Sequence, residues 1–347
     1  MQTRVCRLHA QGDIRVETES LGAPGADEVV IAMGAGGIWG SDLHYFLHGG
    51  FGAIRVREPI ILGHEASGTV IALGAGVGDL KEGQRVAVNP SRPCGVCSYC
   101  CEGLTTHCLD MRFSGSAMRM PHEHGLFRDR MIVKAAQCVP VPGGTDLSEA
   151  ACAEPLAVCL HAGHMAGDLA GKRVLVTGAG PIGALCAAVA RQRGADEIVV
   201  TDLQDTPLQV ARAMGADRTI NVATDADLLD PYKAEKGHFH VVFECSAAAP
   251  ALATAIACAR PQGRIVQVGV TGDLPVPIQP LVGKELTLQG TQRFRHKEFD
   301  AAVAAIASRA IDVRPLITGR YPLEQAQDAF EAAADRTRSS KVHLTFA

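Results

Sequence analysis

Four closely spaced cysteines are the clearest candidate for chemistry in this sequence. Two residues separate Cys94 from Cys97 and Cys97 from Cys100, and Cys108 follows after seven more. Four thiolates at this spacing suit a tetrahedral zinc site, and four protein ligands leave no open position for a substrate. The predicted role of this site is therefore structural, because zinc binding supplies free energy that orders a long loop.

A second group of residues with metal-ligand chemistry is spread along the chain. His64 and Glu65 follow a short apolar run, and Glu154 stands between Ala153 and Pro155. One imidazole and two carboxylates can hold a zinc ion and leave a position open for catalysis. A hydrogen-bonded core histidine and a surface glutamate would give the same spacing, so both interpretations stay open.

A glycine-rich turn indicates nucleotide binding. Gly178, Gly180 and Gly183 form a G-x-G-x-x-G pattern, with Pro181 and Ile182 between the last two glycines, after an apolar run and before a helical stretch. In that context the glycines permit a tight turn, a close approach to a pyrophosphate and close packing of helix on strand. The helix N-terminus offers N–H groups to the phosphates. An ordinary glycine turn of another α/β protein is the alternative.

Asp202 ends the next predicted strand, 24 residues after Gly178. A carboxylate at this place accepts hydrogen bonds from the ribose hydroxyls and repels a 2′-phosphate. The next arginine along the chain is Arg212, so NAD is favoured over NADP. If the turn does not bind a nucleotide, Asp202 is expected to cap a helix.

Length and composition exclude several classes of protein. The chain has 347 residues, a length typical of about two domains. Its net charge of −4 argues against a nucleic-acid partner, and 47% hydrophobic with 20% charged residues indicates a globular chain. We find no signal peptide and no membrane-spanning run, so we expect no membrane association and a cytoplasmic location. In a reducing compartment, clustered cysteines are more often metal ligands than disulfide partners.

The elements that must position these residues change along the chain. Residues 5 to 150 are rich in Gly and Pro, with short β-like runs, and predict a β-rich domain. From residue 172 onward, helical lengths separate six apolar strand candidates, which predicts a parallel sheet with helices on both faces. These candidates are 174–177, 197–201, 219–222, 240–245, 264–268 and 285–289. Helices at 298–309 and 323–335 and a strand at 341–346 then indicate a return to the first domain.

Together these features resemble the zinc-dependent medium-chain dehydrogenases, the alcohol and polyol dehydrogenase group. The resemblance covers essentially the whole chain. It is carried by the cysteine segment, the glycine turn and the motifs at 40–44, 62–68 and 154–156. The implied α/β fold is a GroES-like catalytic domain at 1–154 with a zinc lobe at about 90–110, a Rossmann doubly wound NAD-binding domain at 155–290, and a return at 291–347. Members are usually homodimers or homotetramers that pair the last strands of this sheet, here 285–289.

The resemblance also implies roles for individual residues. His64 corresponds to the histidine ligand of the catalytic zinc, and Glu65 and Glu154 to carboxylates that bind the zinc or its water. Ser41 and His44 correspond to a relay that carries the substrate's proton through the cofactor ribose to solvent. Asp42 is expected to hydrogen-bond a ligand histidine. The zinc of this family lowers the pKa of the substrate hydroxyl, and a hydride passes to the nicotinamide.

One position departs from the family pattern. Where the family reads G-I-C-G-S-D, with the cysteine a catalytic zinc ligand, this chain has Trp39, its only tryptophan. Indole nitrogen only donates hydrogen bonds and does not ligate zinc. Three interpretations remain open: a disabled enzyme that still binds NAD, a working enzyme with an altered metal site, and a zinc-independent reductase.

Several stretches resemble members of the family that oxidise the sugar acid L-idonate at C5. They are residues 89–95, 110–113, 115–118, 233–237 and 282–285. A sugar acid needs a cation for its carboxylate, which guanidinium can grip with two hydrogen bonds. The candidates are Arg112, Arg119, Arg293 and Arg295, and Tyr45 is expected to contact the substrate. A sorbitol or other polyol dehydrogenase would share the scaffold without needing that cation.

Overall fold

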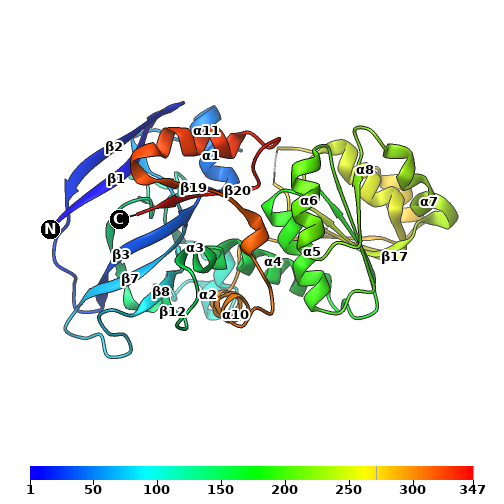
Figure 1. The fold of residues 1–347 in the computed structure, drawn as a ribbon. Coiled ribbons are helices and arrows are strands. Elements are labelled where there is room, and N and C mark those ends of the chain that lie inside the picture. The colour runs from blue at the N-terminus through cyan, green and yellow to red at the C-terminus, as the bar shows by residue number, and fades with distance from the viewer. Residues whose placement is uncertain (271, 347) are drawn as a thin grey trace.

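The computed structural model describes residues 1–270 and 272–346. Figure 1 shows two lobes side by side, one built from the N-terminal strands together with the C-terminal end of the chain, and one from the middle of the chain. No helix among the described residues is long and apolar enough to cross a membrane.

The first lobe is built on a seven-stranded sheet. Its order is β12-β8-β7-β3-β20-β19, and β11 also pairs with β3. These strands are β3 (Glu28–Gly37), β7 (Glu65–Leu73), β8 (Arg85–Val88), β11 (Arg130–Lys134), β12 (Cys138–Pro140), β19 (Ile317–Pro322) and β20 (Lys341–Thr345). β20 lies antiparallel to β3, so the C-terminal strand joins the sheet that the N-terminal segment begins.

Smaller elements surround this sheet. A three-stranded sheet has the order β2-β1-β6, and two strand pairs complete the lobe. The strands are β1 (Gln2–Ala10), β2 (Asp13–Ser20), β4 (Gly50–Phe51), β5 (Ile54–Arg55), β6 (Ile60–Ile61), β9 (Ser91–Arg92) and β10 (Arg112–Phe113). The helices are α1 (Gly40–His48), α2 (Ser98–Cys101), α3 (Leu147–Ala151) and α11 (Ala326–Ala334).

The second lobe contains a six-stranded, all-parallel sheet of order β15-β14-β13-β16-β17-β18. The strands are β13 (Arg173–Thr177), β14 (Glu197–Asp202), β15 (Arg218–Asn221), β16 (Phe239–Glu244), β17 (Ala259–Gln267) and β18 (Thr287–Gly290). Numbered from β13, this is the order 3-2-1-4-5-6 of the doubly wound Rossmann fold. The predicted fold class is confirmed.

Alternate side chains of each strand enter different cores, one on each face of the sheet. Val174 and Val176 belong to one core, and Leu175 between them belongs to the other. The first core contains residues of α4 (Ala153–Ala166), α5 (Pro181–Gln192), α6 (Asp205–Ala213) and α10 (His296–Ala307). The second contains residues of α7 (Asp230–Lys233) and α8 (Ala249–Cys258), with α9 (Ile278–Gly283) packed against it. Burial on both faces explains the continuous apolar runs that predicted this sheet.

The predicted boundaries differ from the observed ones at several places. β18 begins at Thr287, two residues later than predicted, and α10 starts earlier, at His296. The predicted helix at 323–335 divides into a 3-10 turn, Leu323–Gln325, and α11. The strand β19 was not predicted, because it is only six residues long, contains Gly319 and ends at Pro322, and Gly and Pro are both uncommon in strands. We retain 1–154, 155–290 and 291–347 as a proposed division into domains.

Candidate functional site

The four cysteines of the predicted structural site come together in the first lobe. The Sγ atoms of Cys94, Cys97, Cys100 and Cys108 lie within 4.8 Å of one another. The N–H of Cys94 donates to Cys108 Sγ at 3.1 Å, and the N–H of Cys97 donates to Cys94 Sγ at 3.3 Å. Backbone donors at Leu109 and Cys100 lower the pKa of Cys97 to about 6. This cluster therefore fits a zinc ion in its donor set and in the short distances between its sulfur atoms.

The glycine turn connects β13 to α5 at the carboxyl edge of the parallel sheet. The φ of Gly178 is +89°, and a Cβ there would approach the backbone after β16 at 2.9 Å. A Cβ on Gly183 would lie 1.8 Å from the oxygen of Gly178, whereas one on Gly180 would meet no atom within 4 Å. Pro181 and Ile182 form the first turn of α5. Packing therefore requires glycine at positions 178 and 183. Gly180 faces open space at the N-terminus of α5, which suits a pyrophosphate.

Asp202 lies at the same edge of the sheet, at the end of β14. Its Oδ2 accepts a hydrogen bond from the N–H of Ala179 at 2.7 Å, which ties the strand end to the glycine turn. The same oxygen lies 2.7 Å from Nη2 of Arg336, which follows α11. Arg336 is 134 residues further along the chain. The residues immediately after Asp202 therefore give no sign of this cation, which only the fold brings to the carboxylate.

His64 and Glu65 lie in the interior of the first lobe, where β7 begins. Burial lowers the pKa of His64 to about 3, so the imidazole is neutral at pH 7, as a metal ligand must be. Glu65 is fully buried, and its Oε1 lies 2.5 Å from Nζ of Lys341 on β20. Burial raises the pKa of Glu65, although the ammonium of Lys341 opposes this effect. One of the two carboxylates predicted for the metal is therefore held in a buried ion pair.

Glu154 is buried in the first turn of α4, which excludes the interpretation of a surface glutamate. Burial, and then the negative charge of Glu65, raise the pKa of Glu154 well above its usual value. One oxygen of each carboxylate, Glu154 Oε2 and Glu65 Oε2, is buried without a hydrogen-bond partner. Within the described part of the chain, however, the cysteine cluster is the one group of three or more metal-ligand residues whose ligand atoms lie within 4.8 Å of one another. His64, Glu65 and Glu154 do not form such a group.

Trp39 stands at the N-cap of α1, beside His64. The centroids of the indole and imidazole rings are 5.8 Å apart in an edge-on arrangement. Nζ of Lys341 lies 5.1 Å from the indole centroid. The indole thus lies close to both His64 and the Lys341–Glu65 ion pair. Because indole does not ligate zinc and His64, Glu65 and Glu154 do not gather their ligand atoms, the residues present here do not fit a catalytic zinc, and the predicted loss of a cysteine ligand at position 39 stays a prediction.

Asp42 does not make the expected hydrogen bond to His64, since its Oδ1 lies 3.8 Å from His64 Nδ1. Instead it accepts from the N–H of Trp39 at 3.0 Å and from the N–H of Gly63 at 3.2 Å. Burial raises the pKa of Asp42 to about 7. Asp42 therefore joins the segment of Trp39 to the segment of His64 through their backbones.

Ser41 and His44 lie one helical turn apart on α1, so both face the same side of the helix. His44 lines a cavity of about 360 Å³ together with His48, Phe51 and, from the other lobe, Ser246 and Ala247. Partial burial, and then His48, lower the pKa of His44. A histidine between the two lobes suits a relay that ends at a cofactor bound there.

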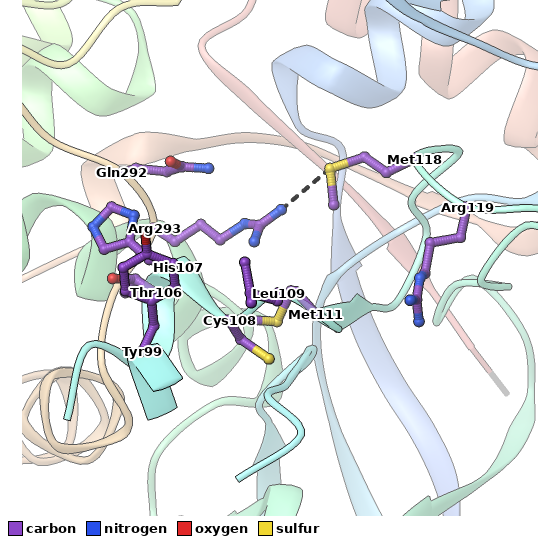
Figure 2. A pocket seen from close by; sticks show the side chains of 10 residues that line it. All are labelled: Tyr99, Thr106, His107, Cys108, Leu109, Met111, Met118, Arg119, Gln292 and Arg293. Carbon is purple, nitrogen blue, oxygen red and sulfur yellow. Dashed lines mark hydrogen bonds between the residues drawn. The ribbon is translucent and has the colours of Figure 1, made fainter. Parts of the chain in front are cut away.

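A larger cavity of about 690 Å³ opens beside the cysteine cluster, with Cys108 in its wall (Figure 2). The guanidinium of Arg293 points across it toward Met118 Sδ at 3.3 Å and lies 5.1 Å from the ring centroid of Phe113. Burial lowers the pKa of Arg293, and the charge of Glu154 opposes this effect. Arg119 also lines the cavity but is paired with Asp110.

The other residues predicted to contact the substrate lie elsewhere. Arg112 pairs with Glu123 at 2.5 Å and is half-exposed. Arg295 forms the N-cap of α10. Tyr45 is buried in the core of the first lobe, and its hydroxyl accepts from the N–H of Ala117 at 3.3 Å. The substrate contact expected for these three residues stays a prediction.

Sequence reasoning missed Glu244, which organises the carboxyl edge of the parallel sheet. It is fully buried at the end of β16. It accepts from the hydroxyl of Thr177 at 3.3 Å and from the N–H groups of Ser246 at 2.9 Å and Ala247 at 3.1 Å. The one available signal was an acidic residue at the end of an otherwise apolar strand.

Comparison with known proteins gives matches along nearly the whole chain. Residues 25–143 match the model of the alcohol dehydrogenase GroES-like domain, and residues 181–308 match that of the zinc-binding dehydrogenases. The chain is 43% identical over 318 residues to an L-idonate 5-dehydrogenase (NAD(P)(+)) of Escherichia coli, covering 91% of each chain. It is 36% identical over 328 residues to a sorbitol dehydrogenase of Gallus gallus, covering 93% of this chain and 91% of the relative.

A solved structure agrees with these sequence matches. The crystal structure of L-idonate 5-dehydrogenase from Escherichia coli superposes with a TM-score of 0.95 at 40% identity, covering 100% of this chain and 99% of that one.

Proposed function

Because the chain belongs to the zinc-binding dehydrogenases with an alcohol dehydrogenase GroES-like domain, we propose that it is an NAD-dependent oxidoreductase for L-idonate. The reaction is the reversible oxidation of the C5 hydroxyl to 5-keto-D-gluconate, with turnover impaired by Trp39. The proposal includes a cytoplasmic location, in line with the sequence.

The environment of Arg293 is the observation that favours a sugar acid over a neutral polyol as the substrate. Its side chain is half-buried at the wall of an open cavity, and desolvation lowers its pKa. Among the described residues, no carboxylate forms an ion pair with it. A partly desolvated cation without a counter-ion is costly, and a substrate carboxylate supplies that counter-ion with two parallel hydrogen bonds.

Other residues are proposed to bind the cofactor and to remove the substrate's proton during hydride transfer. The glycine turn and Asp202 bind the dinucleotide at the carboxyl edge of the sheet. Ser41 and His44 take the proton from the C5 hydroxyl toward the cleft between the lobes. A zinc ion, when bound in relatives of this family, supplies the positive charge that makes this hydroxyl acidic. In this chain Trp39 takes the place of a ligand for that ion, so we expect slow proton loss from C5.

The test is turnover by the natural protein and by the Trp39→Cys variant. L-Idonate with NAD, 5-keto-D-gluconate with NADH, and D-sorbitol with NAD are each followed at the absorbance of NADH. We expect Trp39→Cys to oxidise L-idonate about 100-fold faster or more than the natural protein does. D-Sorbitol is expected to be a poor substrate of both, because it lacks the carboxylate.

Trp39 also favours a second candidate function, a catalytically inactive NAD-binding protein that keeps the fold. The same assays separate the candidates. Oxidation of D-sorbitol as fast as L-idonate by Trp39→Cys would assign a polyol dehydrogenase. Turnover by Trp39→Cys alone, with NADH still bound by the natural protein, would assign the inactive binding protein.

We also propose that the protein forms a homodimer or homotetramer through β18. This strand is at the edge of the six-stranded sheet. Leu288 on this strand and Ile278 and Val282 on α9 are exposed apolar residues. An unpaired edge beside apolar side chains is typical of a surface that pairs with a second copy. The molar mass in solution, by light scattering, tests this expectation.

A further inference from the structure

The carboxylate of Asp202 is surrounded by four hydrogen-bond donors. Its Oδ1 accepts from the N–H groups of Leu203 at 2.7 Å and Gln204 at 3.1 Å. Its Oδ2 accepts from the N–H of Ala179 and from the guanidinium of Arg336, each at 2.7 Å. Three of these donors are backbone groups fixed by the turn and the strand end. Arg336 is the donor that a bound ligand can replace.

The side chain of Arg336 is free to exchange partners. It is 53% exposed, whereas the side chain of Asp202 is 3% exposed. Asp202 is the one carboxylate that pairs with Arg336 in the described part of the chain. When Arg336 leaves, its exposed guanidinium is hydrated by water, and the buried carboxylate of Asp202 keeps its three backbone donors. A stronger anion near Asp202 can therefore capture the guanidinium.

The loop that carries Arg336 is held at this edge of the sheet. The hydroxyl of Thr206, in the first turn of α6, donates to the carbonyl oxygen of Thr337 at 2.7 Å. Asp335 closes the loop by accepting from the N–H of Thr337 at 3.1 Å and from its hydroxyl at 2.6 Å. These bonds fix the backbone on both sides of Arg336 and leave its side chain exposed to solvent. The loop thus places a cation beside the carboxylate that is expected to bind the adenosine ribose.

We propose that Arg336 determines whether the cofactor site accepts the 2′-phosphate of NADP. This inference rests on the proposed use of a nicotinamide dinucleotide. With NAD, the ribose hydroxyls replace Arg336 on Asp202. With NADP, the guanidinium turns from the carboxylate to the 2′-phosphate, for which its planar fork is well suited. The backbone donors at Ala179, Leu203 and Gln204 meanwhile keep the charge of Asp202 compensated. The site then binds both cofactors.

The test measures nucleotide binding without substrate or turnover. AMP and adenosine 2′,5′-bisphosphate differ only in the 2′-phosphate, and their affinities are measured by calorimetry for the natural protein and for Arg336→Ala. NADH and NADPH are titrated in parallel by their fluorescence. We expect Arg336→Ala to weaken the bisphosphate and NADPH by roughly 10- to 100-fold. AMP and NADH should change by less than about threefold, since Asp202 and its backbone donors remain and the ribose hydroxyls take the place of Arg336.

Two further variants sharpen the test. Arg338→Ala removes an exposed arginine from the same loop and should leave all four affinities unchanged. Arg336→Lys keeps the charge without the planar fork and should retain part of the preference for the 2′-phosphate.

Other results would overturn the proposal. One is a natural protein that binds AMP and NADH but not their 2′-phosphorylated counterparts. Another is an Arg336→Ala variant that weakens all four nucleotides equally. Either result leaves the proposed dehydrogenase intact. Failure to bind any of the four would instead remove the cofactor on which both proposals depend.

Discussion

Trp39 stands where the resemblance predicts a cysteine ligand of zinc, and its surroundings bear directly on that prediction. The indole lies beside the neutral imidazole of His64 and beside Lys341, which is paired with the buried Glu65. A thiol is far smaller than an indole, so a cysteine at position 39 would both add a ligand and open space. The unpartnered oxygens of Glu65 and Glu154 are then available to a metal or its water.

The metal content therefore tests the role of Trp39 directly. We expect the natural protein to hold about one zinc per chain, in the cysteine lobe, and Trp39→Cys to hold about two. Elemental analysis of purified protein checks both numbers. Trp39→Phe, which adds no ligand, should stay at one, and Cys97→Ser should lose the zinc of the lobe. Two zinc ions in the natural protein would show that Trp39 does not disable the site.

Arg293 is expected to select the substrate. In the Trp39→Cys background, Arg293→Gln should raise the KM for L-idonate by about 10- to 100-fold, because a charged hydrogen bond to the carboxylate is lost. The low activity on D-sorbitol should not change. Steady-state kinetics with both substrates measures this difference. Arg119→Gln is the matched control in the same cavity, and it should have little effect because Arg119 is already paired with Asp110. Equal losses on both substrates would mean that Arg293 does not recognise the carboxylate.

At the scale of elements, α4 and α10 are joined by one buried polar contact. Nδ1 of His161 on α4 lies 2.9 Å from Oε1 of Glu298 on α10. The other oxygen of Glu298 accepts from the N–H of Arg295 at 2.7 Å and so caps α10. Burial opposes ionisation of Glu298, but the hydrogen bonds from His161 and Arg295 outweigh it and lower its pKa. The position of α4 matters for the site because Glu154 lies in its first turn.

This contact predicts a pH-dependent stability. A carboxylate with a lowered pKa stabilises the fold fully above its unfolded pKa, near 4.5, and loses that contribution as the pH falls through the folded value. Glu298→Gln should therefore cost about 1–2 kcal/mol at pH 7 and progressively less below pH 4.5. Urea unfolding at several pH values measures the difference. Glu331→Gln, at an exposed position of α11, should show no such trend. A cost that is the same at pH 7 and pH 4 contradicts the prediction.

At the scale of the whole molecule, the C-terminal strand closes the first lobe over the candidate site. β20 pairs with β3 and carries Lys341, whose Nζ bonds Glu65 and the carbonyl oxygen of Ile38. Both side chains of this ion pair are almost fully buried. A chain end far from β7 in sequence therefore supplies the counter-charge for a carboxylate at the start of that strand.

Removing one partner of this pair should destabilise the molecule strongly. Lys341→Met leaves Glu65 buried without its cation and should cost about 3–5 kcal/mol of unfolding free energy. The double variant Lys341→Met with Glu65→Leu should recover much of that loss, because it leaves no unpaired charge. Chemical unfolding of the three proteins measures the coupling. If the double variant is no more stable than the single one, the loss comes from packing rather than charge.

The sequence by itself determined the features that depend on neighbouring residues. The four cysteines gather because they lie within one short loop. The parallel sheet follows from apolar runs buried on both faces, and the glycine turn follows from backbone space that admits no Cβ at Gly178 and Gly183. These features can be predicted because periodicity and backbone sterics depend only on residues that are close together in the sequence.

Only the tertiary structure decided which distant side chains meet. Lys341 reaches Glu65, Arg336 reaches Asp202 and Trp39 faces His64 across strands and loops that are far apart in the chain. Glu154, in the first turn of α4, is buried rather than on the surface because that helix packs into a core. Charge pairing and burial depend on which surfaces come together when the lobes form, and a single sequence carries no periodic signal for them.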